Sequence, residues 1–127
     1  MSNALAFRDV TFDVRTIRNT TYITSAQLAA ALGYATENAV TKIYHRNADE
    51  FTVEMTVTQN GSGGQLPTRL FSLRGAHLVA MFARTPVAKD FRKWILDVLD
   101  KETKAAVNLL DKDYFAKVRD IAIKFAD

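Results

Sequence analysis

The amino-acid sequence predicts an α+β fold, in which a small antiparallel sheet built from hairpins packs against helices and is followed by a C-terminal amphipathic helix. Two periodicities support this prediction. Near the N-terminus and again in the middle of the chain, apolar and polar residues alternate, which is typical of strands that bury one face. Elsewhere apolar residues recur at every third or fourth position, which is typical of helices packed on a core.

The first strands and the first helix are expected near the N-terminus. Alternation at residues 10–14 and an apolar segment at residues 22–24 predict two strands joined by a polar turn. Thr24 and Gln27 have the spacing of a capping box, in which the hydroxyl accepts the N–H three residues on and the Gln27 side chain reaches back. The Ala-rich run that follows is expected to end at Gly33 in the left-handed conformation.

A second helix is expected after a turn of three residues, 33–35. Thr36 is placed to act as its N-cap, and Glu37 lies at the positive end of the helix dipole. The residues that follow are apolar at helical spacing, and they are Ala39, Val40, Ile43 and Tyr44.

The alternating pattern returns at residues 51–57 and predicts one strand of a long hairpin. The tip of this hairpin is expected at residues 60–65. The return strand is expected at residues 70–73, after Pro67 at an edge or a strand start. A helix should follow over residues 75–83.

A further helix is expected to begin at Thr85, the predicted N-cap, and Pro86, whose missing N–H costs nothing at the first helical position. We expect Phe91 and Trp94 to lie in the core rather than at a binding surface, because they belong to the apolar stripe of this helix. The stripe consists of Val87, Phe91, Trp94, Ile95 and Val98.

The sequence divides into a predicted domain over residues 1–104 and an amphipathic helix over residues 105–127. This helix would expose an apolar strip in a monomer, so we expect it to act as a linker or to form homo-oligomers. The strip includes Tyr114, Val118, Ile121 and Phe125. Because the sequence stops at Asp127 without a capping signal, we also expect a further C-terminal domain beyond it.

Composition excludes several classes of protein. The chain has 127 residues, a formal net charge of +3 and no Cys, which fits one soluble domain without disulfides or a thiolate metal site. The N-terminus lacks the pattern of a signal peptide, and no apolar stretch is long enough for a membrane helix. We therefore expect a cytoplasmic protein without a membrane partner. The small positive excess allows an anionic partner but does not specify one.

No catalytic or cofactor site is predicted. His45 and His77 lie on different predicted helices, and no zinc-ligand spacing accompanies them. The Gly-rich run at residues 61–64 joins two strands and lacks the Gly-Lys-Ser/Thr and the helix of a phosphate-binding loop. Ser25 and Ser72 have no His placed nearby by any motif, which favours a capping role. We expect a binding module without cofactor or metal, not an enzyme.

The distribution of basic residues allows a nucleic-acid partner. Residues 48–68 contain no Lys or Arg, so the central hairpin is a poor phosphate contact. The second predicted helix could lie in a major groove and present polar side chains to base edges or phosphates. An ordinary solvated surface is the alternative for each basic residue. The residues predicted to contact DNA are Asn38, Thr41, Lys42, Arg46, Arg74, Arg84, Lys89 and Lys93.

Four motifs occur in order along the chain. They are Phe12-x-Val14-Arg15-Thr16, then Tyr22-Ile23-Thr24 before Leu28-Ala29-x-x-Leu32-Gly33-Tyr34, then Leu70-Phe71-Ser72-Leu73-x-Gly75, and Thr85-Pro86-x-Ala88-x-x-Phe91-x-x-Trp94-Ile95. Over about residues 7–100, this ordered set resembles the N-terminal domain (Bro-N) of the BRO family, shared by baculovirus repeated proteins and bacteriophage antirepressors. The resemblance implies an α+β domain at the N-terminus of viral and prophage regulators, associated with DNA binding and antirepressor activity.

The sequence is compatible with two functions. In the first, the domain serves transcription regulation by binding double-stranded DNA, with the basic residues on phosphates and Asn38 or Thr41 nearest the bases. In the second, it captures a phage repressor protein without contacting DNA, through a surface such as Tyr34, Tyr44 or the hairpin tip. We take DNA binding as the primary hypothesis and repressor capture as its alternative.

Overall fold

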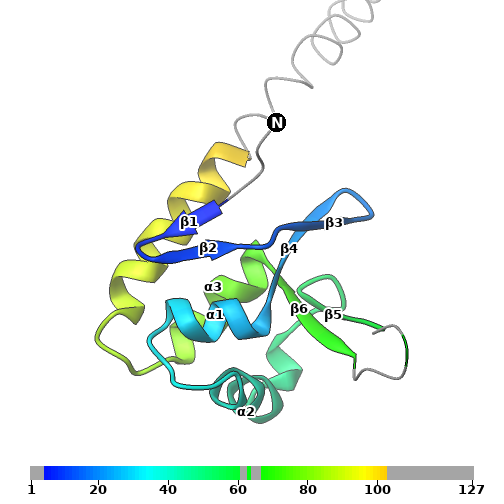
Figure 1. Ribbon diagram of the computed structural model, residues 1–127, viewed down its shortest axis with the longest axis horizontal. Helices are drawn as coiled ribbons and strands as arrows, with labels where there is room; N and C mark the ends of the chain where they lie inside the picture. The colour runs from blue at the N-terminus through cyan, green and yellow to red at the C-terminus, as the bar shows by residue number, and fades with distance from the viewer. Residues whose placement is uncertain (1–4, 61–62, 64–66, 103–127) are drawn as a thin grey trace, which may run out of the picture. The chain divides into compact units, whose positions relative to one another are not determined.

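The computed structural model describes residues 5–60, 63 and 67–102, and its elements confirm the α+β class (Figure 1). The elements in chain order are β1 (Leu5–Phe7), β2 (Val10–Phe12), β3 (Arg15–Ile17), β4 (Thr20–Thr24), α1 (Ser25–Ala31), α2 (Asn38–Arg46), the 3-10 helix η1 (Ala48–Glu50), β5 (Thr56–Gln59), β6 (Thr68–Ser72) and α3 (Leu73–Phe82). A further helix covers residues 88–102. One compact unit extends to Leu96, and a second begins at Asp97. The predicted helix over residues 105–127, with its oligomerisation residues, lies outside the described residues.

The strands form two antiparallel sheets. β1 pairs with β2, and the larger sheet has the strand order β3-β4-β6-β5. A two-residue turn joins β3 to β4, and its residues Arg18 and Asn19 have φ angles of 52° and 65°. A turn with two left-handed residues matches the twist of the paired strands. The polar turn expected between the first strands is therefore confirmed.

The N-terminal strands are more numerous than predicted, and β4 begins two residues before the predicted strand at residues 22–24. Instead of one strand at residues 10–14, β2 ends at Phe12 and β3 starts at Arg15. The chain leaves the ladder at Asp13, whose backbone N–H donates to the side-chain oxygen of Gln27 at 2.6 Å. The Gln27 side chain therefore binds the backbone of Asp13 instead of the backbone N–H of the N-cap Thr24. That half of the predicted capping box is wrong.

The two central strands run directly into helices. Thr24 ends β4, and its hydroxyl accepts the Gln27 N–H at 3.2 Å at the start of α1, as predicted. Ser72 ends β6, and its hydroxyl accepts the Gly75 N–H at 3.0 Å at the start of α3. Because this cap leaves no loop between strand and helix, β6 ends one residue earlier than predicted and α3 begins about two residues earlier.

The predicted strand over residues 51–57 is mostly wrong. Strand β5 begins only at Thr56, and the chain before it forms η1 and a further turn. Val53 lies on that turn and is 88% exposed, so the alternation of apolar residues does not mark one buried face. The Tyr22 hydroxyl holds the turn by donating to the Glu54 carbonyl at 2.9 Å.

An aromatic cluster joins the β1–β2 hairpin to the helix at residues 88–102. Phe12 stacks on Trp94 with ring centroids 5.7 Å apart, and Phe7 meets Phe91 edge-on at 5.3 Å. Phe91 is fully buried, which confirms its expected place in the core, and Trp94 is half-buried within the cluster. This packing covers one side of the core.

The start of that helix differs from the prediction. Its first helical residue is Ala88, whose N–H donates to the backbone carbonyl of Thr85 at 3.2 Å. The Thr85 hydroxyl is buried and has no hydrogen-bond partner among the described residues, so the predicted side-chain cap is wrong. Pro86 lies in the turn that precedes the helix.

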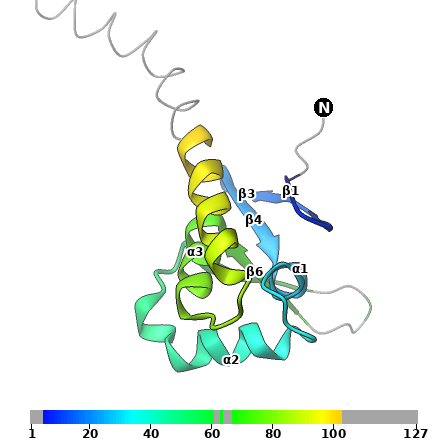
Figure 2. The same cartoon turned by 90° about the vertical axis from the view of Figure 1, so that its left-hand side faces the viewer.

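Helix α2 lies at one end of the first unit. It contacts α1 and α3, and it is found below both of them in the two perpendicular views (Figures 1 and 2). One side of α2 is exposed in this position.

Gly75 allows the first turn of α3 to approach the backbone that precedes β5. A Cβ at this position would lie 2.2 Å from the Met55 carbonyl oxygen, which accepts the Ser72 N–H at 2.9 Å. We expect Gly75→Ala to lower the free energy of unfolding by about 1–3 kcal/mol, because overpacking forces backbone atoms to move. Urea denaturation followed by circular dichroism measures this change. The control is Arg74→Ala on the same turn, which is exposed and should alter stability by no more than about 0.5 kcal/mol. An unchanged Gly75→Ala variant would contradict the close approach.

Candidate nucleic-acid interface

Helix α2 is positioned by the way α1 ends. The Gly33 N–H donates to the Ala30 carbonyl at 3.1 Å, and the Tyr34 N–H donates to the Ala29 carbonyl at 2.9 Å, which is the Schellman arrangement. Gly33 has a φ angle of 83°, as predicted. The connection to α2 spans residues 32–37 and is thus longer than the expected turn of three residues.

Ser25 and Glu37 fasten the start of α2 to α1. The buried Ser25 hydroxyl donates to the Glu37 carboxylate at 2.7 Å. Thr36, the predicted N-cap, contributes only its carbonyl, which accepts the Ala39 N–H at 3.4 Å. Glu37 occupies the N-cap position without a capping side-chain bond. The predicted cap is wrong because α2 is anchored by a contact with α1 instead of by its own first turn.

The inner side of α2 packs through a second aromatic cluster. Tyr44 meets Phe51 and Phe71 edge-on, with ring centroids 5.2 and 6.1 Å apart. The Arg69 guanidinium lies 4.3 Å from the centre of the Tyr44 ring. Val40 is buried on the same helix. Tyr44, which the sequence offered as a protein-binding residue, is thus engaged in packing within the unit.

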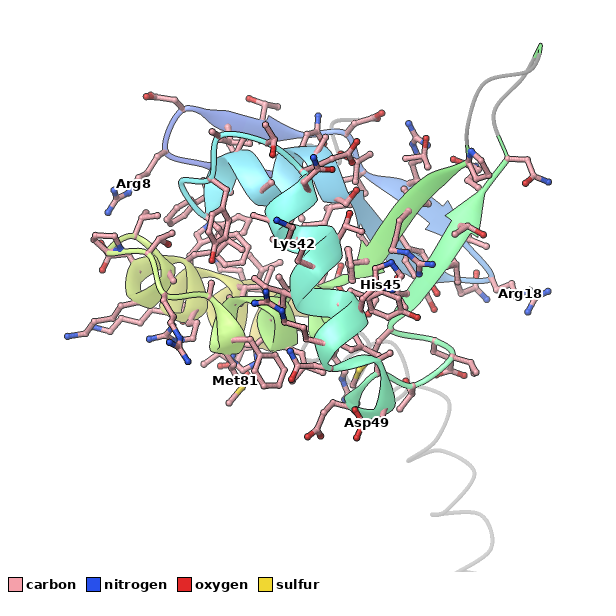
Figure 3. The ribbon with its side chains drawn as sticks, turned by 90° about the horizontal axis from the view of Figure 1, so that it is seen from below. Arg8, Arg18, Lys42, His45, Asp49 and Met81 are labelled. Carbon is pink, nitrogen blue, oxygen red and sulfur yellow. The ribbon has the colours of Figure 1, made fainter. Side chains whose placement is uncertain are left out.

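The outer side of α2 is polar and basic. Asn38, Lys42, His45 and Arg46 are exposed, and Figure 3 shows Lys42 and His45 on the helix in the foreground. Thr41 is half-buried, and its hydroxyl donates to the backbone carbonyl one turn earlier at 3.3 Å. The exposed side of α2 therefore offers hydrogen-bond donors and positive charge.

A cavity of about 510 Å³ lies beside α2 and is lined by three cationic side chains. Lys42 and Arg46 line it from successive turns of α2, and Arg84 lines it from the segment that follows α3. The other lining residues are Tyr34, Ala39, Ile43, Asn47 and Phe82. Within the described part of the chain, no carboxylate lines this cavity, here termed the α2 cavity.

A second hollow, of about 560 Å³, lies between α3 and the helix that follows it. It is here termed the Met81 groove, and it is lined by His77, Met81, Lys89, Arg92, Lys93 and Leu96. Met81 precedes Phe82 at the end of α3. The groove and the α2 cavity therefore adjoin at that turn.

The fold places five of the eight predicted DNA contacts at these two hollows, and Asn38, Thr41 and Arg74 line neither. Lys42, Arg46 and Arg84 meet at the α2 cavity, whereas Lys89 and Lys93 line the Met81 groove. The four-residue spacing of Lys42 and Arg46 already predicts that both lie on one face of a helix. Only the tertiary fold brings Arg84 to the same cavity.

Arg92 is a groove residue that the sequence did not single out. Its guanidinium donates to the Ala80 carbonyl at 3.0 Å, near the end of α3, where backbone carbonyls attract a cation. Burial lowers the pKa of His77 in the same groove, and the positive charge of Arg92 lowers it further. The contact joins residues on two helices, so no local sequence signal could have revealed it.

Among the residues that the structure describes, no group of three or more His, Asp or Glu side chains is arranged to hold a metal ion. His45 and His77 lie on α2 and α3, respectively. None of the described helices combines the length and the apolar character needed to cross a membrane. The two cation-lined hollows are candidate binding features of the described residues.

Comparison with known proteins identifies the domain family. The family model described as BRO family, N-terminal domain, matches residues 12–101. The matched segment contains every residue that lines the α2 cavity and the Met81 groove. No curated protein and no solved structure matches the chain.

The Ser25–Glu37 hydrogen bond can be tested by a double-mutant cycle. Ser25→Ala and Glu37→Ala each remove one partner, and we expect a coupling free energy of about 0.5–1.5 kcal/mol, the usual value of one hydrogen bond. Urea denaturation of the two single variants and the double variant gives this quantity. Thr36→Ala is the matched control, because the Thr36 side chain is exposed and should contribute less than about 0.5 kcal/mol. Additive effects of the two substitutions would show that the contact does not hold α2.

The environment of His77 predicts a pH dependence of stability. The folded state lowers the pKa of His77, so the unfolded chain binds this proton more readily as the pH falls. Stability contributed at neutral pH is therefore lost on acidification from about pH 7 through the lowered pKa. Lys89 and Lys93 are the other cations that line the same groove among the described residues.

We expect His77→Gln to show a weaker loss of stability than the wild type between about pH 7 and pH 5. Thermal denaturation across this range is the measurement. His45→Gln, at an exposed position of α2, controls for the loss of an imidazole as such. Identical pH profiles of the wild type and His77→Gln would contradict the prediction.

Proposed function

The chain belongs to the BRO family through its N-terminal domain, and we propose from this that it is a phage antirepressor-type transcription regulator that binds double-stranded DNA through α2. The family match confirms the resemblance found in the sequence and agrees with a regulator of the antirepressor type. DNA binding is a finer proposal, and it is supported by the charge and exposure of α2.

The observation that carries the proposal is the convergence of three cations on the α2 cavity. Lys42, Arg46 and Arg84 come from two segments of the chain and line one open space. Because none of the lining residues described here is a carboxylate, their charges are not neutralised within the cavity. Contacts from Lys and Arg to phosphates supply most of the affinity of proteins for DNA backbones. Tyr34 adds a hydrogen-bond donor of the kind that also contacts phosphates, whereas the Asn47 side-chain amide donates to the Ile43 carbonyl at 2.9 Å.

Base contacts are proposed for the first turn of α2. Asn38 is exposed there, and an Asn side chain can form a pair of hydrogen bonds with adenine in the major groove. Thr41 lies one turn further along the helix, where its hydroxyl is shared with a backbone carbonyl. We therefore propose Asn38 as the principal base-reading residue and Thr41 as a secondary one.

The remaining predicted contacts lie away from the α2 cavity. Arg74 is exposed on the first turn of α3 and lines neither hollow. Lys89 and Lys93 line the Met81 groove. We propose that these three residues add to the general attraction of DNA but contribute less than the cations of the α2 cavity.

We expect the chain to bind a mixed-sequence duplex at low ionic strength. If the three cations of the α2 cavity each contact one phosphate, the slope of log affinity against log salt should be about −3. The double variant K42E/R46E should lose most of the binding, and any residual slope should be smaller by about 2, since two phosphate contacts are lost. Fluorescence anisotropy titrations over a series of salt concentrations measure both quantities.

The matched control is K89E/K93E, which changes the net charge by the same amount at the Met81 groove. We expect a smaller loss of DNA affinity for this variant. Equal losses would show that binding follows total charge and not the α2 cavity. A wild-type chain that fails to bind duplex at low salt would refute the proposal and favour capture of a phage repressor without DNA contact.

A further inference from the structure

We propose that the Met81 groove binds an amphipathic helix of a partner protein, with aliphatic side chains on one face of that helix and carboxylates beside them. This inference does not depend on DNA binding by α2. It rests on the combination of exposed apolar side chains and unneutralised cations in one groove.

Two exposed apolar residues line the groove. Met81 is 58% exposed and Leu96 is 47% exposed, and together with Val53 they are the large hydrophobic residues that the described part of the chain exposes. Both line one space of about 560 Å³ between two helices. Grouped apolar exposure marks contact sites, and a groove of this kind accepts the apolar face of a helix. The flexible Met81 side chain can adapt to the shape of the partner.

Three cationic side chains line the same groove. Lys89, Arg92 and Lys93 line it, and no carboxylate does so among the residues that the structure describes. Asp90, which lies between them in sequence, forms an ion pair with Arg8 instead. Complementary charge therefore requires acidic side chains on the partner, placed next to the aliphatic ones.

The exposed Met81 and Leu96 favour a protein over a nucleic acid at this groove. A phosphate backbone would satisfy Lys89 and Lys93, but it offers no apolar surface to bury Met81 or Leu96. The α2 cavity differs in this respect, because neither of these two apolar residues lines it.

The tail of the same chain is a poorer match for the groove. Residues 103–127 contain five Lys and Arg and four Asp, so they carry no excess of negative charge. A basic groove gains little from a segment in which both signs are mixed. We therefore assign the groove to a separate, acidic partner.

The test uses a synthetic helical peptide and the full chain of 127 residues. The peptide, of about four helical turns, carries Leu at positions i, i+3, i+4 and i+7 on one face and Glu on the flanks. A scrambled peptide of the same composition and a version with Gln in place of Glu are the controls. We expect the acidic helical peptide to bind at least about tenfold more tightly than either control in an anisotropy titration.

Variants of the chain locate the site. Met81→Lys and Leu96→Lys, both at exposed positions, should each weaken peptide binding about tenfold, and K89E/K93E should weaken it at least as much. K42E/R46E should leave peptide affinity within about twofold, since the substitutions lie at the α2 cavity. Circular dichroism confirms that each variant is folded.

Each outcome decides the proposal. Equal binding of the scrambled peptide, or peptide binding that Met81→Lys leaves unchanged, would overturn it. A groove that serves DNA would instead show loss of duplex binding in K89E/K93E with no acidic-peptide binding by the wild type, and this result would also overturn it. Failure of DNA binding alone, with peptide binding intact, would refute the proposed function and leave this inference standing.

Discussion

The last residues of β4 and β6 pair with each other, and each strand continues directly into a helix. Ile23 stands opposite Phe71 in the ladder, and the hydroxyls of Thr24 and Ser72 cap α1 and α3. Because no loop separates either strand from its helix, the pairing of two strands fixes where both helices start. The buried residues of β4 and β6 lie at these same ends, so the core forms at the junctions.

The exposed position of α2 follows from this arrangement. α1 is short, and its left-handed end at Gly33 sends the chain away from the junction. The bond from Ser25 to Glu37 and the packing of Tyr44 on Phe71 then hold the helix by one side only. A helix held in this way buries little of its surface, and its other side can carry cations without the desolvation that burial would impose. The α2 cavity thus lies beside a helix whose packing contacts leave its cationic side chains exposed.

Some features that depend on neighbouring residues were predictable from sequence, although the caps predicted at Thr36 and Thr85 were wrong. Features that depend on distant contacts were not predictable. The Thr24 cap and the left-handed Gly33 involve only adjacent turns of the chain, and both predictions were right. The alternation before β5 was misleading because the backbone turns to meet α3, which leaves Val53 in solvent. At the site, α2 and its exposed basic residues followed from helical periodicity. The grouping of Arg46 with Arg84 did not, since it requires the path of the chain around α3.

Cationic side chains line both hollows, and both hollows include a residue from the end of α3. Met81 lines one hollow and Phe82 lines the other. These two residues are neighbours in the sequence, so one turn of α3 contributes to both linings. The linings differ in their apolar content, because the exposed side chains of Met81 and Leu96 belong to the Met81 groove and not to the α2 cavity. A helix end that carries cations on both sides can therefore present two chemically different surfaces, one polar and one partly apolar.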